Sequence, residues 1–345
     1  SRHWNPTNKY LCRALAGMEG TESAQVTASG MSAIASTLLQ LCRAGDEIIA
    51  SRTIYGGTYA LLRNFLPRLG IEVRFVDVND ARALAAAVTA RTRVLYTESM
   101  SNPLLAVADL GALGTFAHGH GLKLVVDNTF TPMILAPARF GADVVIHSLT
   151  KYVNGTSDAI AGAICASKAF VGELVDVNSG ACMLMGPVLD SLRAAGILKN
   201  LHSLHIRMRQ HSKNALALAE HLRARNLKVH YPGLAEHPQN ALLARDGNAA
   251  IGFGGMLTLD AGDEARARQL MTVMQEELVG YLAVSLGYFK TLFSAPGHST
   301  ASEIPTEEQR AMGLTEGLIR FSVGLDDDMA RTLGRVDKSL QRCGL

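Results

Sequence analysis

Short apolar runs alternate with amphipathic stretches over the first half of the chain, up to about residue 166. The apolar runs that predict strands are Asp46–Arg52, Ile71–Val78, Thr92–Ser99, Leu122–Asn128, Ala142–Leu149 and Ala159–Ala166. The stretches that predict helices are Met31–Arg43, Thr58–Leu69, Ala81–Ala90 and Leu110–His120. Strands rich in Val and Ile that are separated by helices are typical of a mostly parallel sheet with helices on both faces. Ligands of such sheets bind beyond the carboxyl ends of the strands.

The pattern changes near Leu201. The elements predicted from there on are a long helix at His202–Arg225, strands at Lys228–Tyr231, Met256–Leu259 and Leu318–Val323, and a final helix at Asp327–Gln341. This order predicts a second, smaller α+β domain, and no long linker separates it from the first. We therefore expect a large domain over residues 10–203 and a small domain over 204–345, preceded by a short segment, 1–9.

Composition narrows the class of protein. The 345 residues are 48% apolar and 19% charged, which excludes a disordered or fibrous chain. A net charge of +2 without a basic stripe argues against a nucleic-acid partner. No apolar run reaches the ~18 to 20 residues of a membrane span. Five scattered cysteines without a CxxC pair favour free thiols and a cytoplasmic protein. His118 and His120 have no cysteine or carboxylate at ligand spacing, so no metal is expected.

The strongest candidate for chemistry is the lysine in His147-Ser148-Leu149-Thr150-Lys151-Tyr152, where a buried strand ends. Two hydroxyl residues stand just before this lysine. An amine on a loop inside an apolar mouth is partly desolvated, which favours its neutral, nucleophilic form, as Schiff-base chemistry requires. The alternative interpretation is a lysine that simply ends a strand in solvent.

A carboxylate ends the preceding strand. Asp127 follows the apolar run Leu122–Val126, where an acid must be paired or become neutral. In pyridoxal phosphate enzymes a carboxylate of this kind keeps the pyridine nitrogen protonated, while a lysine carries the aldehyde carbon. The separation of Asp127 from Lys151 fits one strand–helix–strand step. Taken alone, Asp127 reads equally well as a helix N-cap.

Two weaker motifs complete the candidate set. In Thr27-Ala28-Ser29-Gly30-Met31-Ser32-Ala33 a strand end turns into a helix, so the amides of Gly30 and Met31 can point at an anion. In Ile54-Tyr55-Gly56-Gly57 a tyrosine precedes paired glycines, where its ring can cover a flat cofactor and its phenol can move a proton. Many capped helices and loop tyrosines look the same.

Taken together, these motifs resemble the cysteine/methionine-metabolism family of pyridoxal-phosphate enzymes, which includes cystathionine γ-synthases and lyases, O-acylhomoserine sulfhydrylases and methionine γ-lyases. Further motifs that carry the resemblance are Ser1-Arg2 through Asn5-Pro6-Thr7, Glu98-Ser99 with Asn102-Pro103, Val284-Ser285-Leu286-Gly287, and Arg320 in Ile319–Gly324. The chain is most similar to the methionine γ-lyase branch, through Leu184-Met185-Gly186-Pro187, Tyr231-Pro232-Gly233-Leu234 and Ser285–Tyr288. The resemblance covers nearly the whole chain. It implies PLP fold type I, which is aspartate-aminotransferase-like, with a mostly parallel seven-stranded sheet in the large, PLP-binding domain and a smaller α+β C-terminal domain.

The resemblance also implies a role for each matching residue. Lys151 holds pyridoxal 5'-phosphate covalently and moves protons, Asp127 pairs with the ring nitrogen, and Tyr55 stacks on the ring and protonates the leaving thiol. Ser148, Thr150, Gly30 and Met31 hold the phosphate, and Asn102 touches the ring hydroxyl and the substrate carboxylate. Arg320 clamps that carboxylate, with Ser285 nearby. Arg2 reaches the phosphate of a neighbouring subunit, which implies a homo-oligomer, usually a homotetramer.

The sequence departs from the family pattern at three places. The family has a tyrosine and a longer arm before Ser1-Arg2, so residues 1–9 are expected to be the remnant of that arm. Gly57 stands where many bacterial methionine γ-lyases have cysteine, and Lys290 stands where glutamate is common and where lysine is typical of the sulfhydrylases.

The expected reaction is α,γ-elimination of L-methionine, or of a related γ-substituted amino acid, to 2-oxobutanoate, ammonia and a thiol. Val284 favours this substrate because it offers an apolar contact where cystathionine lyases have glutamate. The alternatives are γ-replacement, as in cystathionine γ-synthase or an O-acylhomoserine sulfhydrylase, and cystathionine lyase activity. A nicotinamide dehydrogenase lacks support because Gly252-Phe253-Gly254-Gly255 is not a GxGxxG motif. A carrier that binds the cofactor without turnover would not need Arg320.

Overall fold

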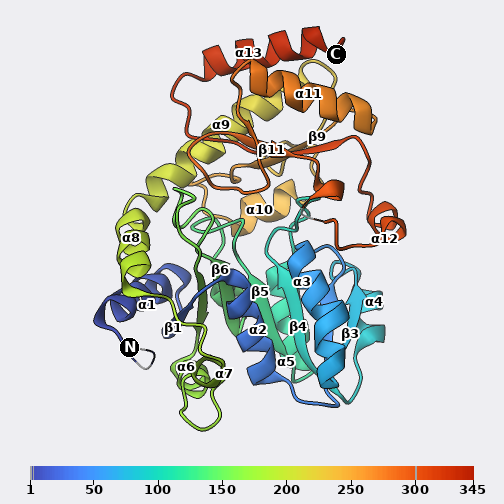
Figure 1. Ribbon diagram of the computed structural model, residues 1–345. Helices are drawn as coiled ribbons and strands as arrows, with labels where there is room; N and C mark the ends of the chain where they lie inside the picture. Colours follow the sequence, from blue (N-terminus) through green and yellow to red (C-terminus); the bar gives the residue numbers. More distant parts are fainter. Residues whose placement is uncertain (1, 3, 300) are drawn as a thin grey trace. The chain divides into compact units, whose positions relative to one another are not determined.

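The computed structural model describes residues 2, 4–299 and 301–345. Packing divides the chain into two compact units, coloured along the sequence in Figure 1. The first unit comprises Ser1–Met100 and Ala108–Ser203, and the second comprises Ser101–Val107 and Leu204–Leu345. The short segment 101–107 therefore packs with residues that lie about a hundred or more positions further along the chain. The hydrophobic pattern reports local periodicity alone, so it carries no signal for the placement of this segment with the second unit.

Within the described residues, the first unit contains a seven-stranded sheet with the order β1-β7-β6-β5-β4-β2-β3. Its strands are β1 (Ser23–Thr27), β2 (Glu47–Ser51), β3 (Glu72–Val76), β4 (Thr92–Glu98), β5 (Lys123–Asp127), β6 (Val144–Ser148) and β7 (Gly162–Ala166). β3, β2, β4, β5 and β6 run parallel, and β7 is antiparallel to both its neighbours. The prediction of an α/β fold with a mostly parallel seven-stranded sheet is confirmed.

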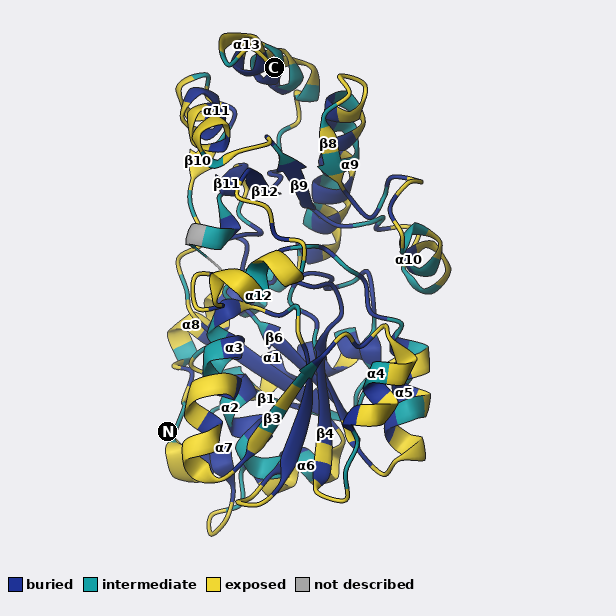
Figure 2. Ribbon diagram, turned by 90° about the vertical axis from the view of Figure 1, so that its right-hand side faces the viewer, coloured by how far each residue is buried: buried dark blue, intermediate teal, exposed yellow. Residues whose placement is uncertain are grey.

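Helices lie on both faces of this sheet, as Figure 2 shows for α2 and α3 on one side and α4 and α5 on the other. The helices of the first unit are α1 (Pro6–Glu19), α2 (Gly30–Leu41), α3 (Gly56–Ala60), α4 (Ala81–Ala87), α5 (Leu110–Gly119), α6 (Lys168–Leu174), α7 (Ala181–Met185) and α8 (Ser191–Leu201). Their buried sides cover strands that are themselves almost wholly buried, because Val, Ile and Ala fill both faces. This packing leaves the strand ends free to carry polar groups.

Two boundaries differ from the predicted ones for local reasons. Helix α1 begins at Pro6, inside the 1–9 segment expected to be part of an arm, because Asn5 caps it by accepting from Thr7 N at 2.9 Å. The helix predicted at Thr58–Leu69 instead changes from α3 to a π turn at Leu61–Phe65 and a 3-10 turn at Leu66–Leu69. Pro67 has no amide hydrogen and its ring crowds the carbonyl four residues earlier, so a regular α-helix cannot continue.

The second unit has its own sheet, five-stranded as far as its residues are described, with the order β10-β11-β12-β9-β8. Its strands are β8 (Lys228–His230), β9 (Met256–Asp260), β10 (Tyr281–Leu282), β11 (Leu292–Ser294) and β12 (Leu318–Ser322). Its helices are α9 (Leu204–Arg223), α10 (Asn240–Asp246), α11 (Glu264–Glu276), α12 (Thr306–Ala311) and α13 (Met329–Arg342). β12 is central and fully buried. Among the described residues, none of the helices is both long and apolar enough to cross a membrane.

Candidate active site

Polar side chains gather where three neighbouring parallel strands end. Glu98 ends β4, Asp127 ends β5 and Ser148 ends β6, and the register places Glu98 beside Asp127 and Asp127 beside Ile146. Because the three strands point the same way, their carboxyl ends form one edge of the sheet. This edge is where α/β sheets bind ligands.

Lys151 lies directly beyond this edge, on a turn that follows β6. Its backbone amide donates to Ser148 O at 3.3 Å, and its carbonyl accepts from Gly155 N at 2.8 Å. The neighbours Leu149 and Tyr152 are fully buried, so the turn is anchored in the core on both sides of the lysine. The lysine itself is partly buried. A side chain on such a turn has a fixed starting point, which suits a residue that must reach one atom.

The start of helix α2 packs against the end of β6. A Cβ atom added to Gly30 would lie 2.8 Å from Ser148 Cβ, so any other residue there pushes the serine away. Ser29 caps the helix by accepting from Ser32 N at 3.0 Å, and the first intrahelical bond runs from Ala33 N to Ser29 O. The amides of Gly30 and Met31 therefore precede the helical bonds and lie at the positive end of the helix dipole. This is the geometry of an anion cradle.

Thr150 is oriented differently from Ser148. Its hydroxyl accepts from Ala161 N at 3.1 Å and donates to Ala161 O at 3.3 Å. In this arrangement the hydroxyl ties the Lys151 turn to the segment that leads into β7. Contact with an anion requires the hydroxyl hydrogen to turn away from Ala161 O.

Asp127 lies in an environment that disfavours its charge. Burial raises the pKa of Asp127, while hydrogen bonds from Thr129 and the nearby His147 imidazole oppose this increase. The amide of Thr129 donates to Asp127 Oδ1 at 2.9 Å, and Ser148 N donates to Thr129 Oγ1 at 2.8 Å. A cation placed against this carboxyl would restore its ionised form. The N-cap interpretation is wrong, because Asp127 closes a turn through Thr129 and no helix begins there.

Tyr55 precedes the short helix α3 and is held by a buried carboxylate. Its amide donates to Glu98 Oε1 at 2.7 Å, and Glu98 is 7% exposed. The tyrosine ring is 41% exposed and lies over Gly57, where an added Cβ would be 2.6 Å from Tyr55 Cε1. Glycine at position 57 therefore permits this orientation of the ring. The sequence placed Glu98 in a family motif but did not predict that it holds the Tyr55 backbone. The signal was present, because Glu98, like Asp127, is a carboxylate at the end of a buried strand.

The residues predicted to contact substrate are brought together in the second unit. Arg320 lies at the middle of β12 and is 2% exposed. Its guanidinium donates to Asn102 Oδ1 at 3.0 Å, to Val284 O at 2.9 Å and to Ser285 O at 3.4 Å. Asn102 belongs to the 101–107 segment, so that segment delivers its amide to the arginine. These neutral oxygens orient the guanidinium without cancelling its charge.

Other predicted residues lie in plainer surroundings. The Val284 side chain is 58% exposed, and its carbonyl rather than its methyl groups contacts Arg320. Lys290 Nζ lies 5.9 Å from the centre of the Phe289 ring, a cation–π contact. Arg2 Nη1 donates to Met183 O at 3.2 Å, which brings the start of the chain to helix α7.

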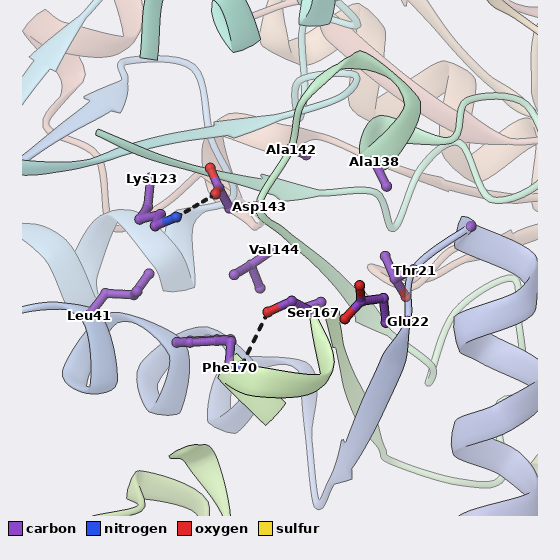
Figure 3. A pocket seen from close by; sticks show the side chains of 12 residues that line it. Thr21, Glu22, Leu41, Lys123, Ala138, Ala142, Asp143, Val144, Ser167 and Phe170 are labelled. Carbon is purple, nitrogen blue, oxygen red and sulfur yellow. Dashed lines mark hydrogen bonds and ion pairs between the residues drawn. The ribbon is translucent and has the colours of Figure 1, made fainter. Parts of the chain in front are cut away.

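A pocket of about 330 Å³ lies at the opposite edge of the first sheet, where β5 and β6 begin (Figure 3). Lys123 Nζ lies 2.8 Å from Asp143 Oδ1 there, and the lysine side chain is 58% exposed. His118, near the end of α5, lies 3.1 Å from the same carboxylate. Lys123 is thus exposed and ion-paired at the edge opposite to the one where Asp127 ends β5.

Comparison with known proteins now identifies the family. The model of the Cys/Met metabolism PLP-dependent enzyme family matches residues 1–333. A methionine gamma-lyase of Arabidopsis thaliana is 46% identical over 99% of this chain and 78% of its own length. An L-methionine gamma-lyase of Pseudomonas putida is 40% identical over 95% of this chain and 81% of its own. The solved cystathionine gamma synthase of Xanthomonas oryzae pv. oryzae superposes with a TM-score of 0.93 at 33% identity, over 99% of this chain and 87% of that one.

The chain belongs to the Cys/Met metabolism family of PLP-dependent enzymes. It has PLP fold type I, and its cofactor is pyridoxal 5'-phosphate. The first unit fits this group on three independent counts. Gly30 leaves room for an anion beside Ser148, Asp127 is a carboxyl that a ring cation would ionise, and Lys151 stands on a fixed turn beyond the same edge.

Replacement of Gly30 by alanine is expected to weaken cofactor binding by about tenfold or more. The new Cβ would lie 2.8 Å from Ser148 Cβ and 3.1 Å from its Cα, so the end of β6 must move away from the cradle. Titration of the apoprotein with pyridoxal 5'-phosphate, followed by its visible absorbance, measures the dissociation constant. Gly17→Ala is the control, because an added Cβ at Gly17 meets no atom within 4 Å. An unchanged dissociation constant in Gly30→Ala would show that the phosphate binds elsewhere.

Proposed function

We propose that the protein is a methionine γ-lyase that converts L-methionine and water to 2-oxobutanoate, ammonia and methanethiol. The observation that carries the proposal is the sequence identity of 46% and 40% to two methionine γ-lyases, over 95% or more of the chain. Val284 supports it, because an exposed valine beside the Arg320 contact offers no partner to the distal ammonium of cystathionine. An apolar thioether needs no charged partner, whereas the ammonium of cystathionine would gain no ion pair from a valine at this position.

The residues at the edge of the first sheet are proposed to hold the cofactor. Lys151 attaches to its aldehyde carbon, and the Asp127 carboxylate faces its ring nitrogen. Its phosphate lies in the cradle formed by the amides of Gly30 and Met31 with the hydroxyls of Ser148 and Thr150, while Tyr55 covers the ring and Asn102 contacts it. When bound, the cofactor supplies an electron sink for the pair left at the substrate Cα.

Arg320 is proposed to bind the substrate α-carboxylate. Its guanidinium presents paired N–H groups from the centre of a buried strand, which suits bidentate recognition of a carboxylate. Asn102 and Ser285 lie beside it and limit the directions from which a carboxylate can approach. This contact fixes the amino acid so that its Cα–H bond and its γ-substituent face their proton acceptor and donor.

Two proton transfers fall to this chain's own side chains. The Lys151 amine takes the proton from Cα, which requires it to be neutral when substrate is bound. A second proton then leaves Cβ, and its electron pair forms the Cβ–Cγ double bond as the Cγ–S bond breaks. The Tyr55 phenol donates a proton to the departing sulfur at Cγ, so that methanethiol leaves as a neutral thiol. The partly exposed ring of Tyr55, held through its backbone by Glu98, suits a group that exchanges protons with water between turnovers.

We also propose a cytoplasmic homo-oligomer, a homotetramer built from active dimers. Large apolar side chains are exposed together on the first unit at Leu184, Met185, Val188 and Leu192, the last of them 85% exposed. Arg2 contacts Met183 next to this group, and we propose that it reaches the phosphate of a neighbouring subunit. The five cysteines are free of disulfides within the described residues, which favours a reducing compartment. Sedimentation of the loaded enzyme as a monomer would contradict this assembly.

A product survey tests the proposed reaction. The cofactor-loaded enzyme is incubated with methionine, cystathionine, homocysteine or O-acetylhomoserine, and 2-oxobutanoate and thioether products are quantified. We expect the highest kcat/KM for ketoacid release from methionine. The second candidate is a γ-replacement enzyme, which Lys290 and the likeness to a cystathionine gamma synthase favour. Thioether formation from O-acetylhomoserine and a thiol, without ketoacid release from methionine, would establish that candidate instead.

A further inference from the structure

A buried acid–imidazole pair lies within the first unit, apart from the groups already assigned. Glu19 is the last residue of α1 and is 1% exposed, and His147 on β6 is fully buried. Glu19 Oε1 accepts from His147 Nε2 at 2.7 Å. His147 stands between Ile146 and Ser148, so its side chain is fixed to the strand that leads into the Lys151 turn.

This pair is a poor way to stabilise a fold. Bringing two ionisable groups out of water costs several kcal/mol each, and their attraction offsets that cost only in part. A carboxylate at the carboxyl end of a helix also opposes the helix dipole. An apolar pair of similar volume would pack at least as well, so the pair must do something that apolar contacts cannot. Hydrogen bonds fix the direction of a side chain, which van der Waals packing does only weakly.

The same carboxylate reaches the neighbouring strand. Asn128 Nδ2 donates to Glu19 Oε1 at 3.1 Å and to Leu135 O at 3.0 Å, and Asn128 is fully buried. Thr131 Oγ1 donates to Asn128 Oδ1 at 2.6 Å and is also 2.7 Å from Ser99 Oγ. Asn128 directly follows Asp127 on the chain. One oxygen of Glu19 therefore joins the residue after Asp127 to the residue before Ser148.

We propose that Glu19 is a positioning residue for the cofactor, which it serves by holding the ends of β5 and β6 in register through Asn128 and His147. The inference rests on the proposed function only in that it takes Asp127 and Ser148 as cofactor contacts. The sheet itself pairs the two strands up to Asp127 and Ile146. Just beyond that point Asn128 N donates to Ile146 O at 2.8 Å and Ser148 N donates to Thr129 Oγ1 at 2.8 Å. Glu19 adds a further link from helix α1, because it joins the side chains of Asn128 and His147. Loss of Glu19 leaves the buried side chains of Asn128 and His147 without their shared acceptor, so the two strand ends are held only by the bonds through Ile146 and Thr129 and can shift relative to each other.

Affinity for pyridoxal 5'-phosphate and the visible circular dichroism of the bound cofactor test the proposal. Glu19→Ala should raise the dissociation constant by about 10- to 100-fold and reduce the dichroism per bound cofactor, because small misplacements of binding groups have effects of this size. Glu19→Gln keeps an oxygen at the position of Oε1 and should restore the affinity to within about threefold of wild type. Thr131→Val removes a more distant part of the same network, so a smaller loss in the same direction is expected.

Glu47→Ala is the matched control. Glu47 is equally buried, begins β2 at the opposite edge of the same sheet, and accepts from Thr89 Oγ1 at 2.8 Å beside Arg74. Its loss should lower the melting temperature without changing the dichroism or the affinity of the folded protein. An equal loss of affinity in Glu47→Ala and Glu19→Ala would show that Glu19 only stabilises the fold, and it would overturn the proposal. So would wild-type affinity in Glu19→Ala, or no recovery in Glu19→Gln.

These readouts do not depend on the substrate. If Glu19→Ala fails to fold, Glu19→Gln and Thr131→Val test the proposal in its place. Wild-type affinity and dichroism in Thr131→Val would show that this hydrogen-bond network does not position the cofactor. A wild-type protein that binds the cofactor but releases no ketoacid from methionine would refute the proposed reaction and leave the role of Glu19 standing.

Discussion

Lys151→Ala should lower ketoacid release by on the order of 1000-fold or more, the largest effect expected of any single substitution in this protein. The substitution removes the amine that we propose attaches to the cofactor and takes the proton from Cα. Alanine is smaller than lysine and the turn is anchored through backbone bonds to Ser148 and Gly155, so folding should be little affected. Initial rates with methionine measure the first effect. Mass spectrometry after borohydride treatment measures the second, since a covalent adduct should form on the wild type and be lost in the variant.

Lys123→Ala is the matched control for this experiment. Lys123 is a lysine of the same unit at the opposite edge of the sheet, exposed and paired with Asp143. Its removal should leave the rate within about twofold of wild type, because exposed ion pairs contribute little. A Lys151→Ala protein that kept normal turnover, or that still gave the borohydride adduct, would show that another amine carries the cofactor.

Arg320→Ala is expected to reduce kcat/KM for methionine by between about thirtyfold and a few thousandfold. This corresponds to a loss of about 2 to 5 kcal/mol in binding free energy. The loss should appear mainly in KM, because the guanidinium contacts the carboxylate in the ground state and the transition state alike. Arg320→Lys keeps the charge but cannot form two parallel hydrogen bonds, so it should recover the activity only in part. Steady-state kinetics of the wild type, Arg320→Ala and Arg320→Lys at saturating cofactor measure KM and kcat separately.

Stability must be followed in parallel, because Arg320 is buried at the centre of a sheet. Its loss leaves Asn102 Oδ1 and the carbonyl of Val284 without this donor, and the melting temperature of the variant should fall. Arg342→Ala removes an exposed arginine of the same unit that pairs with Glu276 and Glu277, and it should change neither KM nor kcat. If Arg320→Ala folds and binds methionine with an unchanged KM, the carboxylate is held by another group.

Much of the cofactor edge could be predicted from the sequence because its signals are local. Asp127 and Ser148 each end an apolar run, and a run of Val and Ile that stops at a polar residue marks both the strand and its end. Lys151 follows within three residues of its strand, so its place beyond the edge follows from the same reading. The parallel order of the sheet then brings these ends together.

The contacts that hold those residues in place could not be predicted in this way. Glu98 reaches the amide of Tyr55, and Glu19 reaches His147, across 43 and 128 positions of the chain. The hydroxyl of Thr150, which the sequence groups with Ser148, accepts from the amide of Ala161, eleven positions further along. The predicted helix that covered Thr58–Leu69 changed character because Pro67 stands inside it. The hydrogen bonds of Glu98, Glu19 and Thr150 depend on which segments pack together, whereas the effect of Pro67 is local and could have been predicted from the sequence.

By itself the sequence determined the parallel sheet, the cofactor and the family, and it predicted the edge at which we propose that the cofactor binds, since each of these is encoded in short patterns of burial, charge and hydroxyl groups. Only the tertiary structure decided that segment 101–107 brings Asn102 to Arg320, that Gly57 leaves space for the ring of Tyr55, and that Glu19 joins two strand ends. The physical reason is the separation along the chain over which each interaction acts. Periodicity and capping act over a few residues, whereas a hydrogen bond between buried side chains requires that distant parts of the chain have already met.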